Sequence, residues 1–298
     1  MDFSSTKRTA KDHGYGFTKT EHNDTYAAID PTKADLSGKR VLITGSARGL
    51  GREIALSFAK AGASGIALLD MLDVAATTKA IPEAALEAGR PSPEVIQLTI
   101  DITSIDQVQQ AAETIKSTWT TLDILINNAG YLASYQPLGD SDPDKWWRNF
   151  EVNVKGVYLM TRSFLPLILA SKDKTMIVMS SVGAHHTLPG GSGYETTKLA
   201  VLKMNSYLMA EYGSQGLLAY GVAPGGVHTA MGESFPEEFH HLLSDSPRMV
   251  ADTMVFLTKG RKEWLGGRYV DSRWDMVELM ERREEIMERD LLNIGLRV

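Results

Sequence analysis

Tyr194 and Lys198 stand four residues apart in the stretch YETTK, and together they could move a proton. At that spacing on a helix, both side chains lie on the same face. A phenol titrates near pH ~10, too high for a base at neutral pH, but a neighbouring ammonium favours the phenolate and lowers that pKa. The pair would then exchange a proton with an alcohol or a ketone.

Two polar residues upstream could complete such a site. Ser181 ends the apolar run TMIVMSS, an expected strand, and ligands collect at the carboxyl ends of parallel strands. Its hydroxyl could hold the reacting oxygen. Ser180 is the alternative, and because side chains alternate along a strand, only one of the two can face the site. Asn153, inside an expected helix, could satisfy a backbone group or hold a water for a proton relay.

Gly45, Gly49 and Gly51 follow the apolar run RVLIT and open a helical pattern. A glycine turn between a strand and a helix lets the backbone approach a pyrophosphate, which the helix N-terminus attracts. The spacing GxxxGxG therefore indicates a dinucleotide site, in which Gly45 makes the turn, Gly49 clears space and Gly51 lets the helix pack closely. The positive ring of an oxidised nicotinamide would lower the pKa of Tyr194 further.

Asp70 ends the next apolar run, GIALLD, where a carboxylate can accept hydrogen bonds from both hydroxyls of an adenosine ribose. The same charge would repel a 2′-phosphate, and Met71 supplies no cation. These residues favour NAD. Arg48, a cation inside the glycine turn, keeps NADP open as the alternative.

From residue 39 the sequence alternates apolar runs with helical patterns. Strands are expected at RVLITG, GIALLD, EVIQLTIDIT, LDILINNAG, TMIVMSS and LLAYGVAPGG, and helices at REIALSFAKAGA, SIDQVQQAAETIKSTW, residues 145–171 and YETTKLAVLKMNSYLMAEYG. Continuous apolar strands between helices predict an α/β fold, a doubly wound parallel sheet covered on both faces. The predicted domain spans residues 39–271, between an N-terminal arm (1–38) and a C-terminal helical tail (272–298).

The two ends leave alternatives open. The polar arm favours a loose segment, although YAAIDP (residues 26–31) could dock on the domain or on a partner subunit. In the tail, apolar side chains recur near helical spacing, which favours a surface helix with an apolar stripe over a subunit contact or a lid. The stripe comprises Met276, Leu279, Met280, Met287 and Leu291.

Composition narrows the functional classes. The 298 residues carry a net charge of −6, so a nucleic-acid surface is not expected. There is no cysteine, which excludes disulfides and thiolate metal sites, and no metal site is expected. The N-terminus has no apolar signal segment, and the longest apolar runs are far too short to span a membrane. We expect a cytoplasmic protein that acts on a small molecule.

Together, the motifs TGSARGLG, NNAG, NVKG, SS, YETTK and PGGVHT resemble, in order and spacing, the short-chain dehydrogenase/reductase family over residues 38–271. The resemblance implies a seven-stranded Rossmann sheet, an Asn153–Ser181–Tyr194–Lys198 catalytic tetrad, and a Lys198 that also holds the nicotinamide ribose. It further implies that Asp101 and Ile102 contact adenine and that Asn128 steadies the sheet beside the cofactor. The cofactor residues expected on these motifs are Gly45, Ala47, Arg48, Gly49, Leu50, Gly51, Asp70, Asp101, Ile102, Asn128, Ala129, Gly130, Tyr194, Lys198, Pro224, Gly225, Val227 and Thr229.

The ends depart from the family pattern, since GGRYVDSRWDM replaces its usual VDGG-like turn. These ends are similar to a subgroup of filamentous-fungal, secondary-metabolism enzymes. The family resemblance implies a homodimer or homotetramer, with dimerisation through the helices around 145–171 and 194–213.

The substrate side is expected in two segments. VGAHHTLPGGSG joins Ser181 to Tyr194, so His185 or His186 could line the pocket or lie exposed; His240 and His241 leave the same choice. TAMGESFPEEFHHLLSDSP resembles a mobile lid. Its apolar residues indicate an apolar, aromatic or cyclic substrate, and they are Met231, Phe235, Phe239 and Leu242.

These features favour an NAD(P)-dependent oxidoreductase that transfers a hydride between nicotinamide and a secondary alcohol or ketone, with NAD preferred. The alternatives are a catalytically silent dinucleotide-binding module and a sugar-nucleotide epimerase or dehydratase. All four tetrad residues count against the first alternative, and the glycine spacing counts against the second.

Overall fold

The computed structural model describes residues 14–295. Seven strands form one parallel sheet in the order β3-β2-β1-β4-β5-β6-β7. The strands are β1 (Arg40–Thr44), β2 (Gly65–Asp70), β3 (Glu94–Thr99), β4 (Ile124–Asn127), β5 (Thr175–Met179), β6 (Leu218–Ala223) and β7 (Tyr269–Asp271). The doubly wound parallel sheet predicted from the sequence is confirmed.

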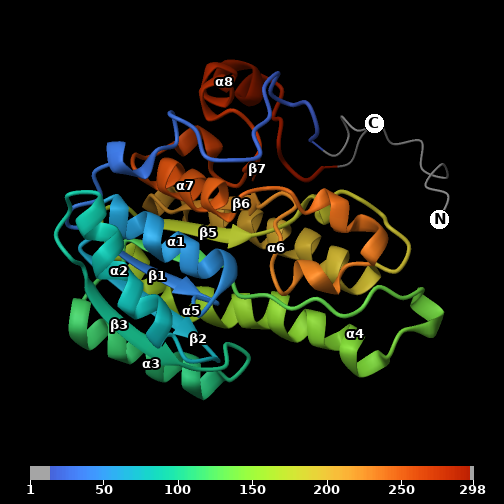
Figure 1. Ribbon diagram of the computed structural model, residues 1–298, viewed down its shortest axis with the longest axis horizontal. Helices are drawn as coiled ribbons and strands as arrows, with labels where there is room; N and C mark the ends of the chain where they lie inside the picture. The colour runs from blue at the N-terminus through green and yellow to red at the C-terminus, as the bar shows by residue number, and fades with distance from the viewer. Residues whose placement is uncertain (1–13, 296–298) are drawn as a thin grey trace.

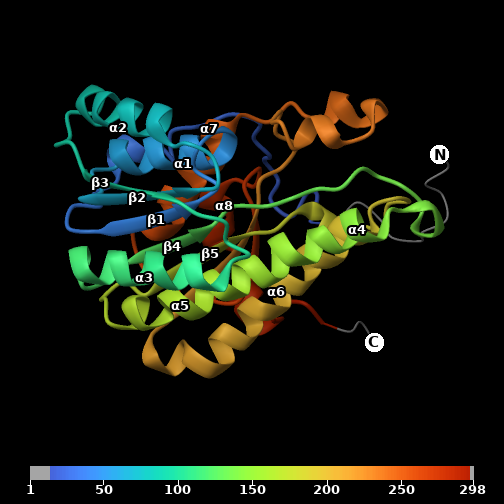
Figure 2. The same ribbon diagram turned by 90° about the horizontal axis from the view of Figure 1, so that it is seen from below.

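Helices cover both faces of this sheet (Figures 1 and 2). One face carries α1 (Gly49–Lys60), α2 (Ala75–Glu87) and α7 (Pro247–Thr258), and the other carries α3 (Ile105–Trp119), α5 (Val157–Leu169) and α6 (Ser192–Tyr212). Side chains of β1 alternate between two cores: Val41 and Ile43 pack on the first side and Leu42 on the second. Burying each such side chain stabilises the fold by roughly 1.5–3 kcal/mol, which explains why the strands are apolar throughout.

Helices α2 and α7 were not among the elements predicted from the sequence. Helix α2 contains Pro82 and many alanines and threonines, so its apolar stripe is weak. Helix α7 is buried almost all round, with its residues from Met249 to Thr258 packed beside α1 in the core on that face of the sheet. Helical periodicity disappears from a sequence when every side of the helix is covered.

The predicted helix over residues 145–171 consists of three consecutive segments. Asp142 caps α4 (Pro143–Phe150) by accepting hydrogen bonds from the next turn, and α5 completes the run. Between them, Glu151–Gly156 forms a π-helical segment that contains Asn153. Such wide turns occur frequently at functional sites.

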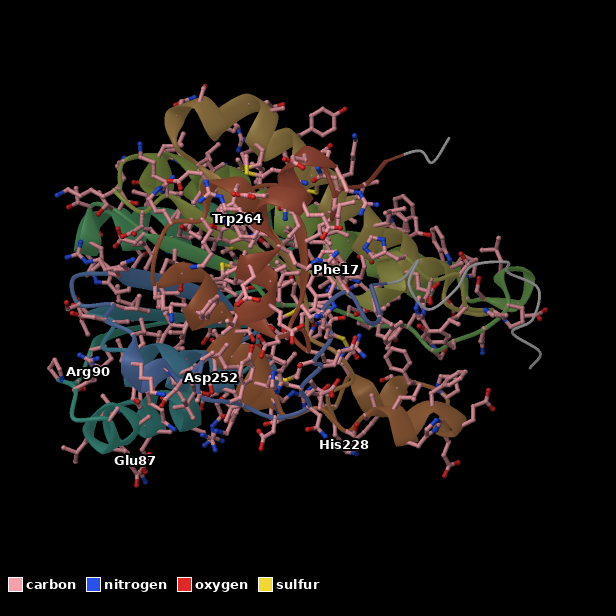
Figure 3. All side chains as sticks on the ribbon, turned by 90° about the horizontal axis from the view of Figure 1, so that it is seen from above. Phe17, Glu87, Arg90, His228, Asp252 and Trp264 are labelled. Carbon is pink, nitrogen blue, oxygen red and sulfur yellow. The ribbon has the colours of Figure 1, made fainter. Side chains whose placement is uncertain are left out.

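Residues 14–38 of the N-terminal arm pack on the domain, as in the docked alternative. Ile29 and Leu36 are buried in the core around α1 and α7. Phe17, labelled in Figure 3, lies with its ring centroid 4.8 Å from that of Trp274. Glu21 forms an antiparallel bridge with Trp274, so the arm runs beside the tail (Figure 1).

The tail forms α8 (Met276–Glu281) and α9 (Arg283–Glu288) and lies over the edge of the sheet. Met276 and Leu279 of the expected stripe are buried, Met287 is exposed, and Ile286 points inward in its place. Leu292 accepts a hydrogen bond from the backbone N–H of Tyr269 in β7. Arm and tail thus cover the outer edge of the last strand.

None of the helices in residues 14–295 combines the length and the apolar character that crossing a bilayer would require.

Candidate active site

The glycine turn between β1 and α1 has no room for a side chain at Gly45 or at Gly51. Gly45 has φ +68°, and a Cβ there would lie 2.9 Å from Ala129 Cα. A Cβ on Gly51 would lie 2.0 Å from the carbonyl oxygen of Gly45. Gly49 has φ +56°, which favours glycine, and a Cβ there would make only ordinary contact with Thr229 Cγ2, at 3.7 Å. The first turn of α1 therefore presents bare backbone to a cavity, which suits a pyrophosphate.

Hydrogen bonds of Asn128 and Thr44 stabilise this turn. The Asn128 side-chain amide donates to the carbonyls of Thr44, at 2.9 Å, and Gly45, at 3.2 Å. In return the Thr44 hydroxyl accepts hydrogen bonds from the backbone N–H groups of Asn128 and Ala129. Thr44 was missed in the sequence, where it reads only as the end of a strand.

Asp70 points back at the glycine turn. Its carboxylate accepts hydrogen bonds from the N–H groups of Ala47 and Leu72, both at 2.9 Å. Asp101 is anchored similarly by Thr103 and lies 3.6 Å from Arg148 of α4. Hydrogen bonds from Thr103 and the charge of Arg148 outweigh its burial and lower the pKa of Asp101.

A cavity of about 500 Å³ connects these groups. Among the expected cofactor residues, it is lined by Gly45, Arg48, Gly49, Leu50, Asp70, Asp101, Ile102, Asn128, Ala129, Gly130, Tyr194, Lys198, Pro224 and Thr229. Four expected cofactor residues do not line it, namely Ala47, Gly51, Gly225 and Val227. The N–H of Ala47 donates a hydrogen bond to Asp70, which does line it, and Val227 is buried. Arg148, Val152 and Met179 line it too, and no sequence motif pointed to them. The rigid glycine cradle and the adjoining cavity fit a nicotinamide dinucleotide.

Tyr194 and Lys198 lie together on α6 and are 8% and 4% exposed. Lys198 Nζ lies 5.4 Å from the centroid of the Tyr194 ring and donates to the carbonyl of Met179 at 2.9 Å. Burial lowers the pKa of Lys198 to about 8. It also raises the pKa of Tyr194 to about 12, against an opposing hydrogen bond with Ser181. In the protein alone, desolvation outweighs the lowering of the phenol pKa that the sequence predicted.

Ser180 and Ser181 face opposite ways after β5. Ser180 is fully buried and donates to the carbonyl of Lys198 at 3.1 Å. Ser181 turns toward the phenol of Tyr194, and its hydroxyl also accepts from the N–H of Gly183. The Ser181 hydroxyl therefore lies beside the Tyr194 phenol, although Ser181 lines neither cavity, whereas Ser180 lines the larger one.

The side-chain amide of Asn153 forms hydrogen bonds with neighbouring protein groups. Its Oδ1 accepts from the N–H of Tyr131 at 2.7 Å, while Nδ2 donates to the carbonyl of Tyr131 and to the hydroxyl of Thr197. The residue thus joins the π-helical segment to the chain after β4 and to α6. Of the two roles predicted for it, this is the bonding of backbone groups.

A second cavity, of about 250 Å³, adjoins the first at Tyr194. Leu132, Tyr135 and Trp146 supply apolar surface, and Lys145 and Asp142 supply charge. Phe235 of the expected lid meets this wall, with its ring centroid 5.1 Å from that of Tyr135. Leu132 and Tyr194 line both cavities, so Tyr194 lies where the two cavities meet.

The other residues expected on the substrate side lie elsewhere. Met231 lines the larger cavity, and Leu242 is exposed. His185 and His186 line neither cavity; their rings lie against Tyr269 and Tyr15. The sequence around Tyr135 gave no signal, because an irregular segment has no periodicity.

Sequence comparison decides the family. The sequence model described as short chain dehydrogenase matches residues 39–239. The chain belongs to this family. Short chain dehydrogenase mpl6 of Monascus purpureus is 43% identical over 95% of this chain and 97% of its own length. Short chain dehydrogenase pigC of Monascus ruber is 43% identical over 94% of this chain and 93% of its own length. The family and the filamentous-fungal subgroup predicted from the motifs are confirmed.

Solved structures agree. A short chain dehydrogenase of Shigella flexneri, complexed with NADP, has a TM-score of 0.71 and 27% identity over 80% of this chain and 99% of its own. Carveol dehydrogenase of Mycobacterium avium, in complex with NAD, shares the fold with a TM-score of 0.71 at 19% identity, over 80% of this chain and 97% of its own. This short chain dehydrogenase therefore belongs to a family of NAD(P)-dependent oxidoreductases.

Proposed function

We propose that this short chain dehydrogenase interconverts a secondary alcohol and a ketone, with Tyr194 as the group that gives or takes the proton. The observation that carries the proposal is the position of Tyr194, which lines both the large cavity and the small one. A dinucleotide in the large cavity would supply or accept the hydride. The substrate carbon would occupy the small cavity, within reach of the same phenol.

The neighbouring residues divide the work. Ser181 holds the reacting oxygen, since its hydroxyl faces the Tyr194 phenol. Lys198 holds the nicotinamide ribose and supplies positive charge beside the phenol, with its Nζ fixed by Met179. Asn153 keeps the segment after β4 against α6, and in this proposal it also supports a water for the proton relay.

We propose NAD as the preferred cofactor. Asp70 lines the cavity and is held by the N–H groups of Ala47 and Leu72, so its carboxylate stays where a ribose 2′-hydroxyl would donate to it. A 2′-phosphate in that place would meet a fixed negative charge. Arg48, on the same cavity, is the group that would admit NADP, with which the Shigella flexneri structure was solved.

The small cavity favours a cyclic or aromatic substrate. Its volume of about 250 Å³ and its Tyr135 and Trp146 walls suit a planar ring, while Lys145 and Asp142 suit polar substituents at the rim. A role in fungal secondary metabolism, in the cytoplasm, is proposed on the similarity to the two Monascus proteins.

We propose a homodimer formed through α4, α5 and α6. Four large apolar side chains of these helices are exposed, namely Trp147, Tyr158, Leu199 and Tyr207. An exposed aromatic surface of this kind is typical of a protein interface.

The function is tested with both cofactors and a panel of cyclic and aromatic ketones and alcohols, followed by absorbance at the reduced nicotinamide band. Tyr194→Phe should abolish turnover and leave the cofactor dissociation constant within about twofold. Full activity in that variant would refute the role of Tyr194. Tight NAD binding without turnover of any compound would instead indicate a silent binding module.

A further inference from the structure

A buried carboxylate lies directly after Tyr194 and belongs to neither cavity. Glu195 is 7% exposed, and its side chain points into the loop formed by residues 182–191. Its Oε2 accepts a hydrogen bond from the N–H of Leu188 at 3.1 Å. Its Oε1 has no hydrogen-bond partner among the described residues. An acidic side chain buried with one oxygen unpaired is costly, so its place calls for an explanation.

The loop is shaped around this side chain. A Cβ on Gly191 would lie 2.7 Å from Glu195 Cδ, and a Cβ on Gly183 would lie 3.2 Å from Glu195 Cγ. Gly191 has an ordinary helical conformation, with φ −82°, which any residue could adopt. A side chain at position 191 would therefore displace the Glu195 carboxyl group rather than strain the backbone.

The same loop carries the wall of the small cavity. The carbonyl of Gly190 accepts a hydrogen bond from the N–H of Gln136 at 3.3 Å. A Cβ on Gly190 would lie 2.9 Å from that nitrogen and 3.2 Å from Tyr135 Cβ, so the two segments are in contact. Tyr135, Gln136 and Gly190 all line the small cavity. A continuous set of contacts thus runs from Glu195 through Leu188–Gly191 to Tyr135.

We propose that Glu195 is a positioning residue for the substrate: its carboxyl group holds the Leu188–Gly191 turn, and through it the Tyr135 wall, at a fixed place relative to Tyr194. The inference rests on the proposed function, because it assigns the small cavity to the substrate. Since Glu195 and Tyr194 are consecutive on α6, any shift of the turn changes the distance between the wall and the reacting phenol.

A double-mutant cycle tests the contact. Glu195→Ala should raise KM for the carbonyl substrate about tenfold, change kcat less than about threefold, and leave the cofactor dissociation constant unchanged. Gly191→Ala should raise KM similarly, because its new methyl displaces the carboxyl. The double variant should have the same KM as Glu195→Ala alone, because the carboxyl group that the new methyl would displace is then absent. Glu195→Gln keeps the shape and an acceptor for Leu188 N–H, so its KM should stay within about threefold of wild type.

A second readout does not depend on turnover. Hydrogen exchange of peptides that cover residues 182–193 should accelerate in Glu195→Ala and in Gly191→Ala, remain slow in Glu195→Gln, and not change over β1 and α1. An additive cycle, or unaltered KM and exchange in Glu195→Ala, would overturn the inference while leaving the proposed function intact. A wild-type protein without turnover would contradict the proposed function, and the exchange cycle would still decide whether Glu195 holds the turn.

Discussion

Lys198 Nζ lies 5.4 Å from the centre of the Tyr194 ring and is tied to the carbonyl of Met179. Both groups are buried, and burial moves their pKa values apart, lowering that of the lysine to about 8 and raising that of the tyrosine to about 12. The protein alone thus keeps the phenol protonated at neutral pH. The state that donates a proton to a ketone is the resting state, whereas the state that accepts one from an alcohol needs added positive charge.

The two directions of the reaction should therefore differ in pH dependence. Oxidation of an alcohol requires the Tyr194 phenolate, so kcat/KM should rise up to about tenfold per pH unit between pH 6 and 9. Reduction of a ketone requires the phenol and should be flat to about pH 8, where Lys198 begins to lose its proton. Steady-state rates in both directions measure this; superimposable profiles would contradict the assignment of Tyr194.

Substitution of the two neighbouring serines should separate chemistry from stability. Ser181→Ala should lower kcat/KM about 10²–10³-fold, because the reacting oxygen loses a hydrogen bond in a dry site. Ser180→Ala removes a buried bond to the Lys198 carbonyl and should instead lower the free energy of unfolding by about 1 kcal/mol. Kinetics and urea titration of both variants provide the check, and the reverse pattern would exchange their roles.

Replacement of Asp70 should shift the cofactor preference. Asp70→Ala removes the charge that a 2′-phosphate would meet, so the ratio of NAD to NADP affinity should fall about tenfold or more. Asp70→Asn also removes the charge but keeps one acceptor oxygen, enough for the N–H of either Ala47 or Leu72, so it loses less of the turn than Asp70→Ala and should shift the ratio in the same direction. Calorimetric titration of both cofactors measures the ratio. An unchanged ratio would mean that Asp70 does not distinguish a ribose 2′-hydroxyl from a 2′-phosphate.

Glu195 should also make stability depend on pH. Burial raises its pKa to about 7, above the usual value of 4.5, although the Leu188 hydrogen bond opposes the shift. A raised acid pKa means that the folded state binds the proton more tightly, so stability is lost as pH rises from 4.5 to 7. Glu195→Gln should therefore be more stable than wild type by about 1–3 kcal/mol at pH 8 and equal to it at pH 4. Thermal unfolding at both pH values provides the measurement.

The sequence predicted the sheet well because its physical signals are local. Apolar runs such as Val41–Ile43 have side chains buried on both faces, and the glycine turn has no room for a Cβ at Gly45 or at Gly51. Helices α2 and α7 were missed, the first for its weak stripe and the second for its complete burial. Likewise, the docking of the arm was the less favoured alternative, because its few apolar anchors, such as Ile29, lie among polar residues.

The site was predictable only in part for a related reason. Tyr194, Lys198 and the glycines stand at fixed spacings in one element or one turn. Tyr135 and Arg148 reach the cavities through contacts between segments far apart in the sequence. Glu195 lines neither cavity, and its burial against Gly183 and Leu188 depends on how the loop before α6 folds back.

The pairing of arm and tail sets an order on folding during synthesis. Glu278 accepts hydrogen bonds from the N–H groups of Lys19 and Thr20, across separations of 259 and 258 residues. At roughly 5–20 residues per second, the ribosome needs roughly 10–50 s to make the chain between them. The hydrogen bonds between Glu278 and this part of the arm therefore cannot form until nearly the whole protein has emerged.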